Sequence, residues 1–191
     1  MANKQYREVK ASGTSFLGRG FVFALRSVLL VNLIFYTTFT DPINVPKFIT
    51  LFISAGWLLG INYYAIRTLV LTIDQKIFIT LSLSFIMCMF IQALLSENIQ
   101  IAFFGDNLRN NGFINYLSLV IFSIFFTISF KRSKIKIFFK YVLATNFALT
   151  FYGTLQILGL DPFSWTGSGG IFTSIGNSNF AGTVYSIVNV L

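Results

Sequence analysis

The chain contains no histidine and only one cysteine, Cys88. Metal sites in proteins are built mainly from histidine, cysteine and grouped carboxylates, and the six acidic residues of this chain are not grouped. We therefore expect no metal site. A single cysteine cannot form a disulfide within the chain. No glycine-rich phosphate loop with its lysine is present either, so neither ATP-driven chemistry nor any other cofactor is indicated.

Charged residues are also scarce, at 10% of the chain, whereas 55% of the residues are hydrophobic and 24 are phenylalanine. A water-soluble domain of 191 residues cannot bury this much apolar surface. The net charge of +8 would suit nucleic acid, but the basic residues stand at the ends of apolar blocks and not along one polar face. The composition therefore predicts an integral membrane protein whose partner is the lipid bilayer and not nucleic acid.

Five apolar blocks are about as long as the roughly 20 helical residues that cross a bilayer. They predict spans at residues 21–39, 48–66, 77–96, 113–130 and 137–158. The expected fold class is all-α, a polytopic transmembrane helix bundle that forms a single domain over residues 1–191, with a cytoplasmic tail at 1–19. Ionisable side chains other than Arg26 are almost absent from the spans, which argues against proton relays and voltage sensors.

A sixth apolar stretch runs from residue 180 to residue 191. Its 12 residues would extend only about 18 Å as a helix, short of a hydrocarbon core of about 30 Å. We expect this stretch to be the start of a sixth span, and the chain to be the N-terminal part of a longer protein. A short re-entrant segment is the alternative.

Lysine and arginine are distributed unequally between the two ends of the predicted bundle. Eleven lie in the tail, the second loop, and the fourth loop with its flank: Lys4, Arg7, Lys10, Arg19, Arg67, Lys76, Lys131, Arg132, Lys134, Lys136 and Lys140. Only Lys47 and Arg109 belong to the other side. Because basic residues accumulate on the cytoplasmic side of membranes, the asymmetry predicts a cytoplasmic N-terminus.

Arg109 stands in the external loop before the fourth span, among amide side chains and glycines. Such a loop suits carbohydrate or lipid headgroups, and it is also the composition of an ordinary solvated turn. The guanidinium is suited to bind a diphosphate through its fork of donors. Pairing with Asp106 and anchoring to a lipid phosphate are its alternative roles. At the start of the sixth stretch, Asn177 is expected to cap the helix, which leaves Asn179 to face a cavity.

Four segments, in order, resemble the O-antigen ligase and polymerase-like membrane glycan transferases. The first, Asp41 to Phe48, is similar to the family's Asp-Pro-x-x-x-Pro-Lys motif, and the second, Ser96 to Leu117, is similar to its external Gly-x-x-x-Arg-x-x-Gly segment, with Gly105, Arg109, Gly112 and Tyr116. The third, Tyr152 to Pro162, is similar to Gly-x-x-Gln-x-x-Gly-x-Asp-Pro. The fourth, Gly176 to Gly182, is similar to Gly-Asn-Pro-Asn-Phe-x-Ala. The resemblance extends from Asp41 to the end of the chain.

The resemblance implies a larger helical enzyme of the bacterial inner membrane. Such an enzyme transfers a glycan from a polyprenyl-diphosphate carrier to a glycan, lipid A core or protein acceptor at the outer leaflet, without a metal or nucleotide. It implies a diphosphate contact for Arg109, and Asn177 and Asn179 are the further candidate substrate-binding residues. The family's catalytic histidine has no counterpart here, so no catalytic residue is assigned. A transporter or flippase fragment for lipid-linked sugars and a small structural membrane subunit are the alternative functions.

Overall fold

The computed structural model describes residues 19–36, 43–67, 70–106, 111–130, 132–161 and 163. The helices within these ranges are residues 19–33, which we call the first helix, α2 (Asn44–Arg67), α3 (Ile73–Leu94), α4 (Ile99–Phe104), α5 (Phe113–Ser129), the short 3-10 helix η1 (Arg132–Lys134) and α6 (Ile135–Ile157). The described residues contain no strand. The all-α prediction is therefore confirmed for this part of the chain.

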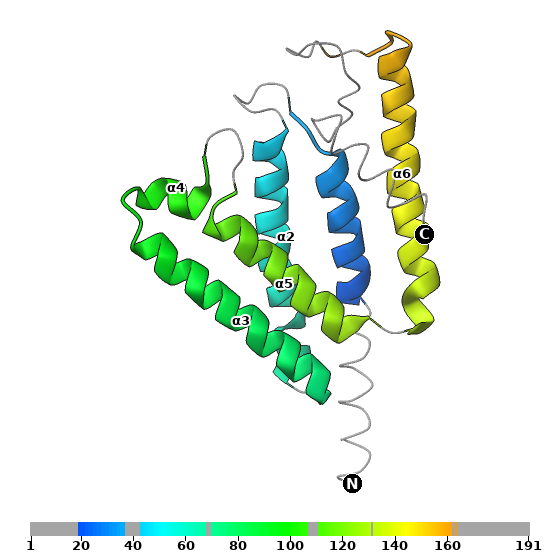
Figure 1. The fold of residues 1–191 in the computed structure, drawn as a ribbon. Helices are drawn as coiled ribbons and strands as arrows, with labels where there is room; N and C mark the ends of the chain where they lie inside the picture. Colours follow the sequence, from blue (N-terminus) through cyan, green and yellow to red (C-terminus); the bar gives the residue numbers. More distant parts are fainter. Residues whose placement is uncertain are drawn as a thin grey trace.

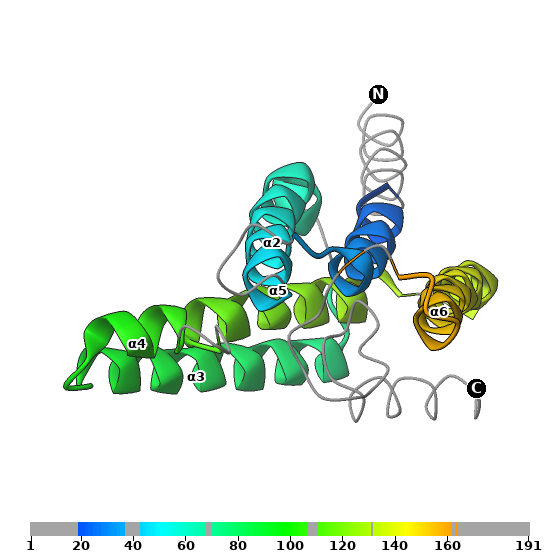
Figure 2. The same cartoon turned by 90° about the horizontal axis from the view of Figure 1, so that it is seen from above.

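The long helices alternate in direction (Figure 1). The start of α3, the end of α5 and η1 lie at the lower end of the bundle in this view, and the start of α2 and the end of α6 lie at the upper end. Seen from above, α5 lies between α3 and α2, and α6 lies on the far side of the first helix (Figure 2). The connections that the sequence assigns to one side of a membrane thus lie at one end of the bundle.

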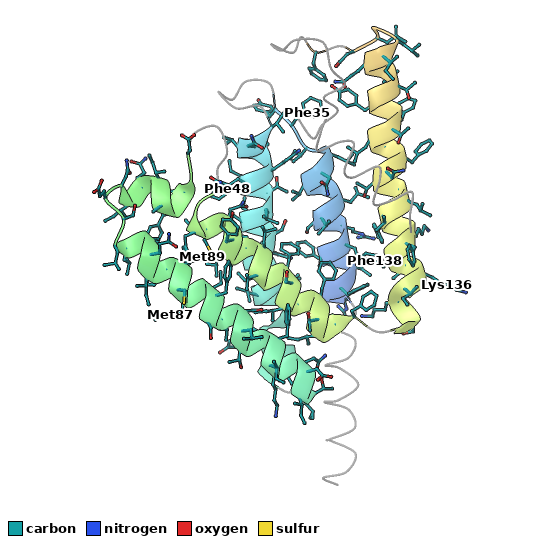
Figure 3. All side chains as sticks on the ribbon, in the orientation of Figure 1. Phe35, Phe48, Met87, Met89, Lys136 and Phe138 are labelled. Atoms are coloured by element: carbon teal, nitrogen blue, oxygen red, sulfur yellow. The ribbon has the colours of Figure 1, made fainter. Side chains whose placement is uncertain are left out.

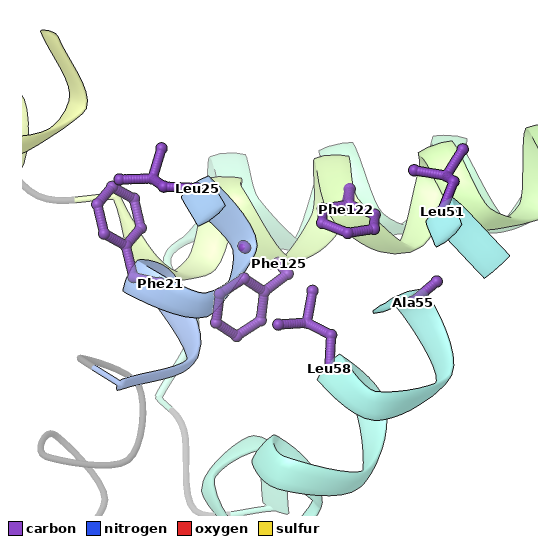
Figure 4. Packing of buried hydrophobic residues seen from close by; sticks show 8 residues of the cluster. Phe21, Leu25, Leu51, Ala55, Leu58, Phe122 and Phe125 are labelled. Carbon is purple, nitrogen blue, oxygen red and sulfur yellow. The ribbon is translucent and has the colours of Figure 1, made fainter. Parts of the chain in front are cut away.

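One buried cluster joins the first helix, α2 and α5 (Figure 4). It consists of Phe21, Ala24 and Leu25 of the first helix, Leu51, Ala55 and Leu58 of α2, and Phe122 and Phe125 of α5. Members on one helix are mostly three or four residues apart, which places them on one face of that helix. At the lower end the Phe21 ring contacts Phe126 and Phe130 of the α5 end, and the Lys134 ammonium lies 4.5 Å from its centroid.

A capping box starts α3 four residues before the predicted position. The Thr72 hydroxyl accepts from the backbone N–H of Gln75, and the Gln75 carboxamide oxygen accepts from the backbone N–H of Thr72. Gln75 Nε2 also donates to the Thr127 carbonyl at 3.0 Å. This carbonyl belongs to the last turn of α5, where backbone carbonyls have no N–H donor within the helix. One side chain therefore caps α3 and joins it to α5.

Two predicted boundaries are corrected by the structure. The first span was predicted to reach residue 39, but its helix ends at residue 33. In the segment that follows, the Phe35 ring packs on Tyr152 and Phe163, a contact that takes the place of a further helical turn. The loop predicted at 97–112 contains α4, which begins where the Asn98 side chain accepts from the Ile101 N–H. The sixth stretch, and all of the predicted tail except its last residue, lie outside the described residues.

Two of the described helices are long and apolar enough to cross a membrane: α2 over Asn44–Ile61, and α3. The apolar α5 is shorter, with 17 residues. Ala93 is the one buried residue of α3, and large apolar side chains are exposed along it, with no described helix on its outer face (Figure 3). The membrane-spanning capacity that is evident by length and composition therefore rests on α2 and α3.

Candidate functional site

The three site residues proposed from the sequence, Arg109, Asn177 and Asn179, lie outside the described residues. The segments on either side of Arg109 are described, and they border a cleft of about 760 Å³ at the junction of α3, α4 and α5. The lining residues are Cys88, Met89, Ile91, Gln92, Ala93, Leu95, Ser96, Ile101, Ala102, Gly105, Asp106, Asn111, Gly112 and Phe113. The cleft is within the size range of small-molecule sites.

Three phenylalanines hold the walls of the cleft together. The ring of Phe90 from α3 lies 6.0 Å from that of Phe103 in α4 and 5.4 Å from that of Phe113 in α5. The rings of Phe103 and Phe113 are 5.5 Å apart. Such tilted and edge-to-face pairs are favourable aromatic geometries. Each wall is thus fixed to the other two by direct ring contact.

Two glycines close the loop that carries Arg109. Gly105 ends α4 with φ of 90°, a conformation that favours glycine over residues with a side chain. Gly112 precedes α5, and a Cβ placed on it would collide with the Gly105 nitrogen and lie 2.5 Å from the Phe103 carbonyl carbon and oxygen. The two ends of the 106–111 segment are therefore held in backbone contact.

The polar side chains of the cleft gather at the upper end of α3. Cys88 and Met89 lie about one and a half turns below Leu94, the last residue of this helix, at about 1.5 Å per residue. Gln92 and Ser96 lie nearer the upper end. Leu95, Ile101 and Ala102 line the upper part as well. A molecule that fills the cleft therefore meets apolar side chains along its whole length and hydrogen-bonding groups at its upper part only.

The polar groups of the upper part come from two directions. Gln92 and Ser96 belong to α3 and the turn after it, whereas Asp106 and Asn111 come from the two described ends of the Arg109 loop. The described residues contain no group of three or more histidine, cysteine, aspartate or glutamate side chains able to hold a metal ion. The Ser96 hydroxyl already donates to the Asn98 carbonyl, so the two amides, Gln92 and Asn111, are the main hydrogen-bonding groups that a ligand would meet there.

A second polar cluster lies at the end of α6. The Asp161 carboxylate accepts from the Tyr152 hydroxyl at 3.1 Å, from Gln156 Nε2 at 2.8 Å and from the Phe163 N–H at 3.0 Å. The Phe35 ring stacks on Tyr152 and meets Phe163 edge-on, with centroids 5.8 and 4.9 Å apart. This cluster ties α6 and the residues after it to the segment that follows the first helix.

A Schellman turn sets the direction in which the chain leaves α6. Gly159 has φ of 69°, its N–H donates to the Gln156 carbonyl, and the Leu160 N–H donates to the Leu155 carbonyl. The glutamine, glycine and aspartate of the Tyr152–Pro162 segment thus have structural roles: the glycine allows the turn, and the side chains of Gln156 and Asp161 bond to each other across it.

Sequence reasoning did not select Gln92 and Asn111. Gln92 is the one strongly polar side chain in the upper half of α3, and this isolation inside a predicted span was the available signal. Asn111 stood among several amides in its loop, where nothing distinguished it. No protein-family model, no curated protein and no solved structure matches the chain.

Proposed function

We propose that the chain is part of a membrane glycan transferase similar to O-antigen ligases and polymerases, and that its cleft receives a polyprenyl-diphosphate-linked glycan. The enzyme would lie in the bacterial inner membrane with five spans and the start of a sixth, its N-terminus in the cytoplasm. The main support for the proposal is the cleft itself: its lower part is apolar and its hydrogen-bonding groups gather at the upper end, as a lipid chain joined to a polar headgroup requires.

Two observations support the membrane arrangement. The apolar surface of α3 is exposed along most of its length, and a helix that is apolar all round is stable when lipid surrounds it. The alternation of helix direction also brings Lys134 beside the start of the first helix, so basic residues from separate loops share the lower end. This is the distribution expected of a cytoplasmic face.

The position of Arg109 in the sequence supports its contact with the diphosphate. It follows Gly105 by four residues and precedes Gly112 by three. A chain extends at most about 3.5 Å per residue, so the loop is tethered close to the polar part of the cleft at both ends. In the proposed reaction the diphosphate is the leaving group, and a guanidinium beside it stabilises the negative charge that develops there.

Binding of a polyprenyl diphosphate to the chain in lipid nanodiscs tests the proposal. We expect Arg109→Ala to weaken binding at least about tenfold, because hydrogen bonds to a charged group are worth about 1.5–3 kcal/mol. Lys47→Ala is the matched control, since it removes the other basic residue of the same predicted side but belongs to α2 and does not line the cleft.

Cys88 gives an independent measurement of occupancy. It is exposed and lines the apolar part of the cleft, so a bound polyprenyl chain should slow its alkylation by a maleimide. Equal binding by the wild type and Arg109→Ala would remove Arg109 from the site. Failure of the wild type to bind the lipid, with no protection of Cys88, would remove the proposed function.

A further inference from the structure

Two carboxamides line the cleft from different elements. Gln92 projects from α3, and Asn111 stands just before α5. Both side chains are exposed, and within the part of the chain that the structure describes neither makes a hydrogen bond. By contrast, the carboxamides of Gln75, Asn98 and Gln156 are each bonded within the fold. Gln92 and Asn111 therefore present unused hydrogen-bonding groups to whatever fills the cleft.

The chemistry of a carboxamide restricts what these groups fit best. Each carries two N–H donors and one carbonyl acceptor. The oxygens of an ionised phosphate or diphosphate only accept hydrogen bonds, so they would leave the carbonyl acceptors unused. Donors and acceptors side by side match hydroxyl and acetamido groups, which both donate and accept.

We infer that Gln92 and Asn111 bind the sugar ring next to the carrier diphosphate, and that this sugar carries an acetamido group or adjacent hydroxyls. The inference rests on the proposed function, because it assigns part of the same cleft. It adds a specificity determinant: the cleft distinguishes a glycosylated carrier from the bare diphosphate. Gln92 and Asn111 are binding residues in this account, with no part in bond breaking.

The test compares two lipids on the intact chain in nanodiscs. One probe is a polyprenyl diphosphate, and the other is the same lipid carrying a single N-acetylglucosamine. The variants are Gln92→Leu, which removes the hydrogen-bonding groups but keeps the helix preference of the position, and Asn111→Ala. Gln100→Leu is the matched control, because Gln100 is exposed on α4 but does not line the cleft.

We expect the wild type to bind the glycosylated lipid more tightly than the bare one. Gln92→Leu and Asn111→Ala should each weaken binding of the glycosylated lipid by about three- to tenfold, the usual effect of losing a neutral hydrogen bond, and leave the bare lipid unchanged. Gln100→Leu should bind both as the wild type does.

The other outcomes separate the two proposals. If the wild type binds both lipids equally and both variants bind as the wild type does, the sugar contact is overturned while the diphosphate site stands. An equal loss for both lipids in Gln92→Leu would assign Gln92 to the diphosphate instead, and would also overturn the inference. If neither lipid binds the wild type, the proposed function fails and the sugar contact fails with it.

Discussion

The backbone of Gly112 lies directly against the backbone of Gly105, with no room for a side chain at position 112. The φ of Gly112 is −77°, a value that any residue adopts, so the close approach and not the backbone conformation requires glycine there. Gly105 differs, because its φ of 90° favours glycine by itself. The two glycines close the same loop for different physical reasons.

Gly112→Ala should open this contact. The added methyl group must displace the Phe103–Gly105 backbone, and we expect a loss of about 1–3 kcal/mol in stability, as for other overpacked sites. Thermal unfolding in detergent measures it. Gly56→Ala is the control, since a Cβ on this α2 glycine meets nothing within 4 Å and should be neutral or stabilise by up to about 1 kcal/mol. Equal unfolding temperatures for the two variants would contradict the close contact.

Gln75→Glu should separate the two roles of Gln75. The carboxylate retains an oxygen for the Thr72 N–H, but it loses the donor to the Thr127 carbonyl and places a negative charge beside that oxygen. We expect a loss of about 1–3 kcal/mol in the free energy of unfolding at neutral pH. The same Gln→Glu change at the exposed Gln100 is the control and should have little effect. A neutral result at position 75 would rule out the contact between α3 and α5.

Asp161→Asn and Gln156→Leu should be strongly non-additive. The amide of an asparagine at position 161 would present a donor to groups that already donate, namely the Tyr152 hydroxyl and Gln156 Nε2. Each single change should cost about 1–2 kcal/mol, and the double variant should cost less than their sum, because residues in one hydrogen-bond network are coupled. A double-mutant cycle on thermal unfolding checks this. Simple additivity would show that the two side chains act independently.

Trp57 provides a direct test of contact with lipid. Its side chain is 62% exposed on α2, about 20 Å along the helix from Asn44 at 1.5 Å per residue. In a Trp165→Phe background it is the sole tryptophan. We expect lipids brominated in mid-chain to quench its fluorescence, and aqueous iodide to have little effect. The opposite pattern would place this face of α2 in water.

The extent to which the sequence predicts the fold differs from helix to helix. α5 and α6 lie within two residues of their predicted bounds, because long apolar blocks there end at glycine or basic residues. α3 starts earlier than its apolar block because the capping pair Thr72 and Gln75 recruits polar residues into the first turn. α4 has six residues, too few for hydrophobic periodicity to identify.

The site residues named from the sequence lie outside the described residues, so their roles stay predictions. The described ends of the Arg109 loop line one side of the cleft, whereas the α3 side depends on which face of α3 meets α5. That contact is made by the rings of Phe90, Phe103 and Phe113, which come from three separate helices. Among 24 phenylalanines, no local pattern distinguishes these three. Gln92 acquires its position in the cleft from this packing.

The side chain of Gln75 also bears on how firmly the walls of the cleft are held. At one end α3 and α5 are joined through Gln75 and Thr127, and at the other through the phenylalanine rings around the cleft. Gln75 stands in the first turn of α3, between Asp74 and Lys76, so this joint lies at the polar end of the helix. The cleft is therefore bordered by two helices that are fixed to each other at both ends, and loss of either joint would leave its α3 wall held at one end only.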